Sequence, residues 1–160
     1  IAAVDGGAVG VGLGIALACD LVVATDRARF MEIFVKRGLA LDGGTSWTIP
    51  RLVGPRRAKQ MAFFGDTVDA ATALDWGLIN EVVAPDDLAG TAHAWGQRLA
   101  TGPTTAISLM KAQIDASATS TFAEAMEDEA RAQHIVYTTA DMQEGILAFL
   151  ERREPRFTGS

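Results

Sequence analysis

The sequence predicts a mixed α/β fold, with a parallel sheet in the first half of the chain and helices in the second. Short apolar runs at 1–4 and 21–24 flank an apolar helical stretch at 12–19, which is the pattern of a β-α-β unit with parallel strands. After residue 85 the apolar residues recur at helical spacing instead. We therefore expect two regions, an α/β core over residues 1–85 and a helical region over residues 86–160.

The other elements follow from turn residues and apolar spacing. Pro55 can occupy the first position of a helix, and Gly65 can end one. In the core we expect a strand or extended segment at 29–35, a loop at 38–45, helical structure from Thr45 that restarts at Pro55 and ends near Phe64, a helix at 70–76 and a strand at 78–83. In the second region we expect helices at 86–100, 103–116, 121–139 and 141–152.

Composition narrows the class of protein. The 160 residues are 49% apolar and 21% charged, which is sufficient for a buried core. A net charge of −6 argues against a nucleic-acid partner, because phosphate binding needs a dense basic patch. No apolar run has the roughly 20 residues of a membrane-spanning helix. We expect a cytoplasmic protein with no membrane partner, and, because the chain opens on a strand without Met, a natural protein that begins upstream.

The sequence offers little for a metal site. Cys19 is the only cysteine, so neither an intramolecular disulfide nor a cysteine-cluster metal site can form. Neither His93 nor His134 has an acidic, cysteine or histidine partner at the spacing of metal ligands. We therefore expect no metal.

A glycine-rich turn over Gly6–Gly14 follows the first strand and precedes an apolar helix. Such a turn lets backbone N–H groups converge at a helix N-terminus, where a pyrophosphate, a phosphate or a developing oxyanion is stabilised. The dinucleotide register fails, because the sixth position of G-x-G-x-x-G is Ile15 or Leu17, and no lysine occurs before Lys36 for a phosphate-binding loop. An oxyanion site is the hypothesis we favour, with tight strand–helix packing as the alternative.

Asp42 is the second candidate for chemistry. It lies between Leu41 and Gly43, where partial desolvation would raise its pKa toward the range of a general base. It also precedes a helical stretch, so helix capping is an equal alternative from the local sequence.

Four stretches together resemble the crotonase (enoyl-CoA hydratase/isomerase) superfamily, in family order: IAAVDGGAVGVGLGIALACDLVVAT, GLALDGGTSWTIPRLVG, AKQMAFFGDTVDAATALDWGLINEVV and DMQEGILAFLERREPRF. They match the C-terminal portion of a member. The resemblance implies a partial spiral of ββα units followed by a C-terminal helical oligomerisation region, in a homotrimer or hexamer. It also implies an acyl-CoA substrate, with coenzyme A as part of the substrate and no separate cofactor.

The resemblance assigns binding roles as well. The Val11 N–H matches one of two backbone donors that hold the thioester carbonyl and stabilise an enolate, with Gly10 and Gly12 beside it. The second donor is expected upstream of Ile1, so we expect the 160-residue chain alone to be inactive. Two further positions, Phe149 and Arg152, match residues that reach the adenine end of coenzyme A.

Departures from the family pattern bear on the reaction. Gly14 and Phe34 replace the two glutamates of hydratases, and neither can accept a proton; Phe34 would only line the substrate site. Glu32 lies two residues from one of these positions. Asp42 falls in the loop where isomerase-type members carry an acid, so we expect an enzyme that shifts a double bond with Asp42 as base. The alternatives are a hydratase with atypical acid and base residues, or a non-catalytic acyl-CoA-binding or assembly subunit.

Overall fold

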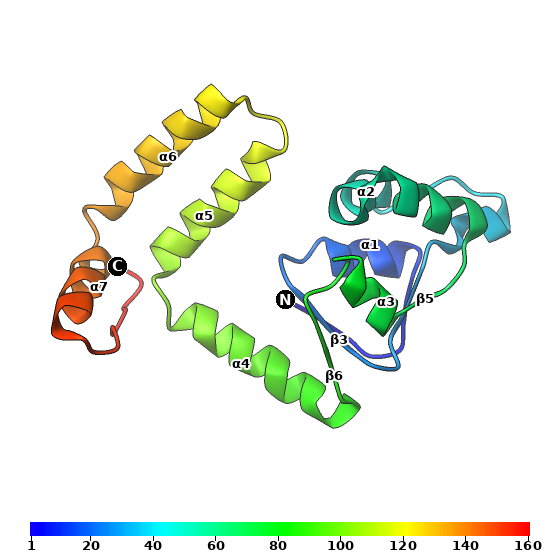
Figure 1. The fold of residues 1–160 in the computed structure, drawn as a ribbon, viewed down its shortest axis with the longest axis horizontal. Helices are drawn as coiled ribbons and strands as arrows, with labels where there is room; N and C mark the ends of the chain where they lie inside the picture. The colour runs from blue at the N-terminus through cyan, green and yellow to red at the C-terminus, as the bar shows by residue number, and fades with distance from the viewer. The chain divides into compact units, whose positions relative to one another are not determined.

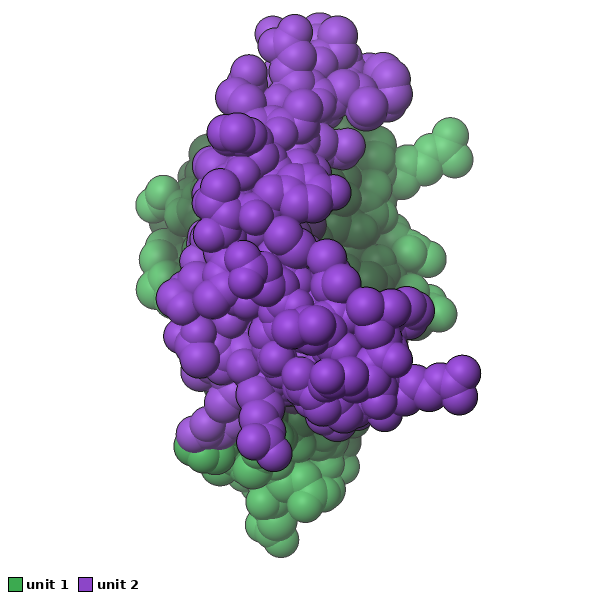
Figure 2. Space-filling model, turned by 90° about the vertical axis from the view of Figure 1, so that its left-hand side faces the viewer, with its two compact units in different colours: residues 1–94 green, residues 95–160 purple.

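The structure, a computed structural model, describes residues 1–160 and consists of two compact units, residues 1–94 and 95–160 (Figures 1 and 2). The boundary falls within helix α4 (Leu88–Ala100). The sequence places it near residue 85, where the last strand, β6 (Glu81–Val83), has ended and helical structure begins. Mixed α/β structure before this point and helices after it agree with the predicted fold class.

Unit 1 contains two three-stranded sheets. The first has the order β1-β3-β6 and is parallel throughout, with Ala2 opposite Val22, so the predicted β-α-β unit is confirmed. The second has the order β2-β4-β5, with β2 and β4 parallel and β4 and β5 antiparallel. Besides β6, the strands are β1 (Ala2–Val4), β2 (Gly7–Val9), β3 (Val22–Thr25), β4 (Arg29–Met31) and β5 (Val68–Asp69).

Strand β2 corrects the interpretation of residues 6–14 as one turn. Glycine has low strand propensity, which hid these residues from a pattern search. Residues 29–35 also differ from a continuous strand, because β4 ends at Met31 and a 3₁₀ helix, η1 (Ile33–Arg37), follows. The glycine-rich segment therefore consists of a strand, a sharp turn at Gly10 and the start of helix α1 (Val11–Leu17).

Helix α2 (Thr45–Phe64) is divided by a kink at Gly54, whose φ of 80° is not helical, directly before Pro55. The predicted restart at Pro55 is thus confirmed. Gly65 ends the helix in a left-handed conformation, and its N–H donates to the Met61 carbonyl oxygen at 2.9 Å. Unit 1 also contains α3 (Ala70–Asp75) and the 3₁₀ helix η2 (Pro85–Asp87).

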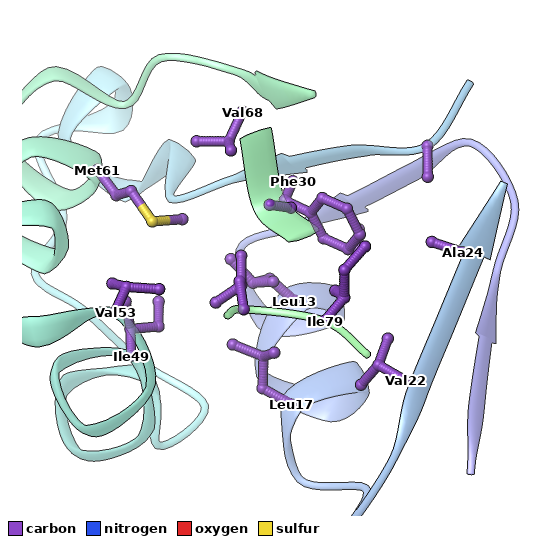
Figure 3. Packing of buried hydrophobic residues seen from close by; sticks show 14 of the residues in the cluster. Leu13, Leu17, Val22, Ala24, Phe30, Ile49, Val53, Met61, Val68 and Ile79 are labelled. Carbon is purple, nitrogen blue, oxygen red and sulfur yellow. The ribbon is translucent and has the colours of Figure 1, made fainter. Parts of the chain in front are cut away.

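The core of unit 1 fills the space between α1, α2 and the strands (Figure 3). Leu13 of α1 and Phe30 of β4 are both fully buried, and Ile49 of α2 is 2% exposed. Burying a side chain of this size contributes about 1.5–3 kcal/mol, so these contacts fix α1 against α2. Helix α1, which begins at Val11, and helix α2, which follows the Asp42 loop, are held by one core.

Unit 2 is helical and contains α5 (Thr104–Ser117), α6 (Phe122–Val136) and α7 (Ala140–Glu151). Helices α5 and α6 lie side by side (Figure 1). The chain end returns to α7, where the Asp141 carboxylate accepts hydrogen bonds from Thr158 N at 2.7 Å and Gly159 N at 2.9 Å. None of the helices is both long and apolar enough to span a membrane.

Candidate active site

Asp5 fixes the position of the chain between β1 and the glycine-rich segment. Its carboxylate accepts two hydrogen bonds of 2.6 Å from Arg27 and one of 2.9 Å from the Thr25 hydroxyl. The Arg27 guanidinium and the Thr25 hydroxyl lower the pKa of Asp5 to about 2, so the carboxylate is ionised at neutral pH. This cluster ties the end of β1 to the loop between β3 and β4.

Gly10 forms the sharp turn that starts α1. Its φ is 54°, and its N–H donates to the Met31 carbonyl oxygen at 2.9 Å. Helix α1 then begins at Val11, and the N–H groups of a first helical turn have no acceptor within their own helix. The N–H groups of Val11 and Gly12 are therefore available as hydrogen-bond donors, as the oxyanion hypothesis requires.

Phe34 supports this turn. Its side chain is only 9% exposed, and a β-carbon built on Gly10 would lie 3.4 Å from the Cζ atom of Phe34. The ring thus packs against the backbone of Gly10 and holds it in place. A direct contact between Phe34 and the substrate stays a prediction.

The loop that carries Asp42 lies directly on α1. A β-carbon at Gly14 would come 2.5 Å from the Gly43 carbonyl oxygen, which is closer than real β-carbons approach other heavy atoms, and one at Gly43 would lie 3.5 Å from the Val11 α-carbon. Any side chain at position 14 would displace this loop. One backbone contact therefore links two features. The Asp42 loop can lie at Val11 only because position 14 carries no side chain, and so no glutamate.

Asp42 does not cap α2. Its Oδ1 accepts a hydrogen bond from the N–H of the next residue, Gly43, at 2.7 Å, and the N-cap residue of α2 is Gly44. The loop is held through the Asp42 carbonyl oxygen, which accepts from the Thr45 hydroxyl at 2.9 Å. The expected desolvation is not found, because Asp42 lies at the surface and is exposed within residues 1–160.

Glu32 is a buried acid that the sequence interpretation left unassigned. It is 1% exposed, and neither carboxylate oxygen has a hydrogen-bond partner. Burial raises the pKa of Glu32 to about 7, and the neighbouring Thr45 hydroxyl opposes this shift. Strand alternation could have indicated its burial, since Glu32 is two residues from Phe30 and shares its face.

The predicted coenzyme A contacts lie in unit 2. Phe149 is on α7 and is 83% exposed, and Arg152 caps the end of α7 in a left-handed conformation with a φ of 54°. Both side chains are exposed at the same end of one helix.

No group of three or more histidine, cysteine, aspartate or glutamate side chains comes together in a way that could hold a metal ion.

Comparison with known proteins decides the family. The sequence model described as enoyl-CoA hydratase/isomerase matches residues 1–160. The chain belongs to the enoyl-CoA hydratase/isomerase family. The crotonase resemblance is thereby confirmed.

Relatives within the enoyl-CoA hydratase/isomerase family carry both kinds of name. The chain is 40% identical over 99% of its length to the 1,2-epoxyphenylacetyl-CoA isomerase of Escherichia coli (strain K12), of which it covers 61%. It is also 40% identical, again over 99%, to a protein of Rhodobacter capsulatus named "Probable enoyl-CoA hydratase", of which it covers 62%. The chain thus spans about three fifths of these relatives.

A crystal structure of the enoyl-CoA hydratase/isomerase type from Mycobacterium abscessus has the same fold. It matches with a TM-score of 0.96 and 40% sequence identity, covering 99% of this chain and 61% of that one. The crotonase-like architecture predicted from the sequence is confirmed by this match.

Proposed function

We propose that the complete protein containing residues 1–160 acts on an acyl-CoA thioester and moves a carbon–carbon double bond, with the Val11 N–H as oxyanion donor and Asp42 as the base and acid. The observation that carries the proposal is the backbone contact between Gly14 and the Asp42 loop. It holds the loop that carries Asp42 against the first turn of α1 and leaves no room for a side chain at position 14.

The proposed step needs one carboxylate. Asp42 takes a proton from C2 of a 3-enoyl thioester, and the C–H electron pair moves toward the carbonyl to give a dienolate whose oxygen accepts the Val11 N–H. Asp42 then returns the proton to C4, the double bond becomes C2=C3 and the carbonyl forms again. One proton and one double bond have moved, and no water is consumed.

Hydration makes a different demand. Adding water across a double bond requires one group to activate the water and one to deliver a proton to carbon. The residues at the two family positions, Gly14 and Phe34, can do neither, and Phe34 is packed against Gly10. These substitutions favour isomerisation over hydration.

We further propose that Phe149 and Arg152 contact the adenine end of coenzyme A and that the complete protein forms a homotrimer or hexamer in the cytoplasm. Large apolar side chains exposed on unit 2 support assembly, because exposed apolar surface of this kind marks interaction sites. Examples are Ile114 at 71%, Phe122 at 83% and Leu150 at 70% exposed.

The test is a product assay on the complete protein. We expect conversion of a 3-enoyl-CoA to the 2-enoyl-CoA and no addition of water to the 2-enoyl-CoA, with the free 3-enoic acid as a substrate control that does not react. Water addition by the wild-type protein would instead support the hydratase alternative. Thioester binding without turnover of either compound would support the non-catalytic alternative.

A further inference from the structure

Thr45, the first residue of α2, fastens the Asp42 loop, residues 38–44, to that helix. Its hydroxyl donates to the Asp42 carbonyl oxygen at 2.9 Å, and its N–H donates to the same oxygen at a longer 3.4 Å. At the other end of the loop, the Leu39 N–H donates to the Phe34 carbonyl oxygen at 3.0 Å. The Thr45 hydroxyl therefore makes the shorter of the two bonds that hold the Asp42 carbonyl group.

Glu32 lies beside this hydroxyl with an unsatisfied carboxyl group. Glu32 is 1% exposed and Thr45 is 0% exposed, and both line one small apolar cavity beside α2. Both carboxyl oxygens are buried without a hydrogen-bond partner, although the Thr45 hydroxyl is near enough to oppose the rise in the pKa of Glu32. A hydroxyl has one proton to donate, and Thr45 donates it to Asp42. The buried acid and the loop therefore compete for one proton.

The charge on Glu32 decides this competition. The neutral acid is the less costly form to bury, and it leaves the Thr45 proton with the Asp42 carbonyl oxygen. An ionised carboxylate needs a donor, and a hydrogen bond to a charged acceptor is roughly twice as strong as one to a neutral carbonyl. Ionisation of Glu32 should therefore turn the Thr45 hydroxyl away from Asp42.

The charged groups on the elements packed around Glu32 are all exposed. They are Lys36 and Arg37 of η1, Asp42 of the loop, Lys59 of α2 and Asp66 beyond α2. Lys59 lines the cavity without a hydrogen bond to Glu32, and Lys36 pairs with Asp66 at 3.6 Å. Burial, rather than a neighbouring charge, raises the pKa of Glu32 to about 7.

We infer that Glu32 is a positioning residue for the Asp42 loop. As the neutral acid it leaves the Thr45 hydroxyl on the Asp42 carbonyl oxygen and keeps the loop fastened; as the carboxylate it withdraws this hydroxyl and releases the loop. The effect on turnover rests on the proposed function, because it requires Asp42 to move the proton. Isomerisation should then slow as the pH rises through about 7, where Glu32 ionises.

Hydrogen–deuterium exchange of the complete protein tests the contact without any substrate. The segment observed is 40–46, which contains the Thr45 N–H, in the wild type and in Glu32→Gln, which stays neutral. Comparing the two proteins at one pH cancels the intrinsic effect of pH on exchange. We expect equal rates at pH 5 and exchange about 10-fold faster in the wild type at pH 8, as the loss of one hydrogen bond predicts.

Variants of Thr45 separate this role from a general loss of stability. Thr45→Val removes the hydroxyl at a similar shape, and Thr45→Ser keeps the hydroxyl. The loop of Thr45→Val should exchange about 10-fold faster than that of the wild type at pH 5 and at the same rate at pH 8, where the wild type has already lost the bond. Thr45→Ser should behave as the wild type at both pH values.

The pH profile of 3-enoyl-CoA isomerisation then connects the loop to turnover. We expect kcat of the wild type to fall between pH 6 and pH 8 and that of Glu32→Gln to show no such fall. Equal loop exchange in these two proteins at pH 8, or a Thr45→Val loop that still exchanges faster than the wild type at pH 8, would overturn the inference. Loop exchange that follows Glu32 in a protein without isomerase turnover would overturn the proposed function alone.

Discussion

Gly14 of α1 and Gly43 of the Asp42 loop are in such close contact that a β-carbon on Gly14 would lie 2.5 Å from the Gly43 carbonyl oxygen. Gly14 therefore does more than remove an acidic side chain from this position, because only a residue without a β-carbon permits this contact. The contact allows the loop to approach Val11, so that Gly43, the residue after Asp42, lies against the first turn of α1.

Gly14→Ala should therefore destabilise the protein. The new β-carbon would meet backbone atoms, and overpacking of this kind costs about 1–3 kcal/mol. Chemical denaturation checks this, with Gly12→Ala as the matched control, since a β-carbon at Gly12 meets nothing within 4 Å. Equal stability of the two variants would show that the loop does not depend on Gly14.

Phe34→Ala should lower the free energy of unfolding by about 3–5 kcal/mol, the usual cost of removing a buried phenylalanine ring. The variant should also loosen the Gly10 turn, whose α-carbon region the ring supports. The control is Phe34→Met, a change of shape at similar volume that should cost less than about 1.5 kcal/mol. Denaturation curves in which the two variants coincide would contradict this role.

Glu32 should make stability depend on pH. Its pKa is raised from 4.5 to about 7 in the folded state, so the folded protein holds this proton more tightly than the unfolded chain does. The resulting stabilisation is complete below pH 4.5 and is lost as the pH rises through about 7, with a magnitude of up to about 3 kcal/mol. Glu32→Gln should remove this dependence.

The measurement is a series of denaturation curves for the wild type and Glu32→Gln at pH 5 and pH 8. The variant should gain stability relative to the wild type at the higher pH. Parallel pH profiles for the two proteins would mean that Glu32 does not titrate in this range.

Asp141→Ala should release the C-terminal residues of unit 2. Asp141 is 4% exposed, and its carboxylate accepts hydrogen bonds from the N–H groups of Thr158 and Gly159. Hydrogen bonds to a charged group contribute about 1.5–3 kcal/mol each. Hydrogen exchange at Thr158 and Gly159 should accelerate in this variant. Glu127→Ala, at an exposed site on α6, serves as the control; protection that persists in Asp141→Ala would rule out the carboxylate as the anchor.

The sequence allowed most of the helices and the parallel β-α-β unit to be predicted, because apolar spacing and turn residues are local signals. Strand β2 was not predicted, because Gly7 has little preference for a strand and the pairing of β2 with β4 is a tertiary contact. The kink at Gly54 was predictable because Pro55 follows it. Local patterns thus identified the elements better than their pairing.

The candidate site was predictable only in part. Glycine at position 14 could be recognised as a missing acid, but its contact with Gly43 joins residues far apart in the sequence and is visible only in the fold. The exposure of Asp42 also depends on how its loop lies on the surface, which its apolar neighbours do not determine. The burial of Glu32 could be predicted only by extending the alternation of buried and exposed residues one position past the end of β4, at Met31.

The most direct test of the account is the rate of 3-enoyl-CoA isomerisation by the complete protein with Asp42→Asn, measured beside the wild type and the exposed-site control Asp66→Asn. If Asp42 moves the proton, kcat should fall by about 100-fold or more while the affinity for the thioester stays the same. Wild-type turnover in Asp42→Asn would contradict the assignment of Asp42 as the catalytic base.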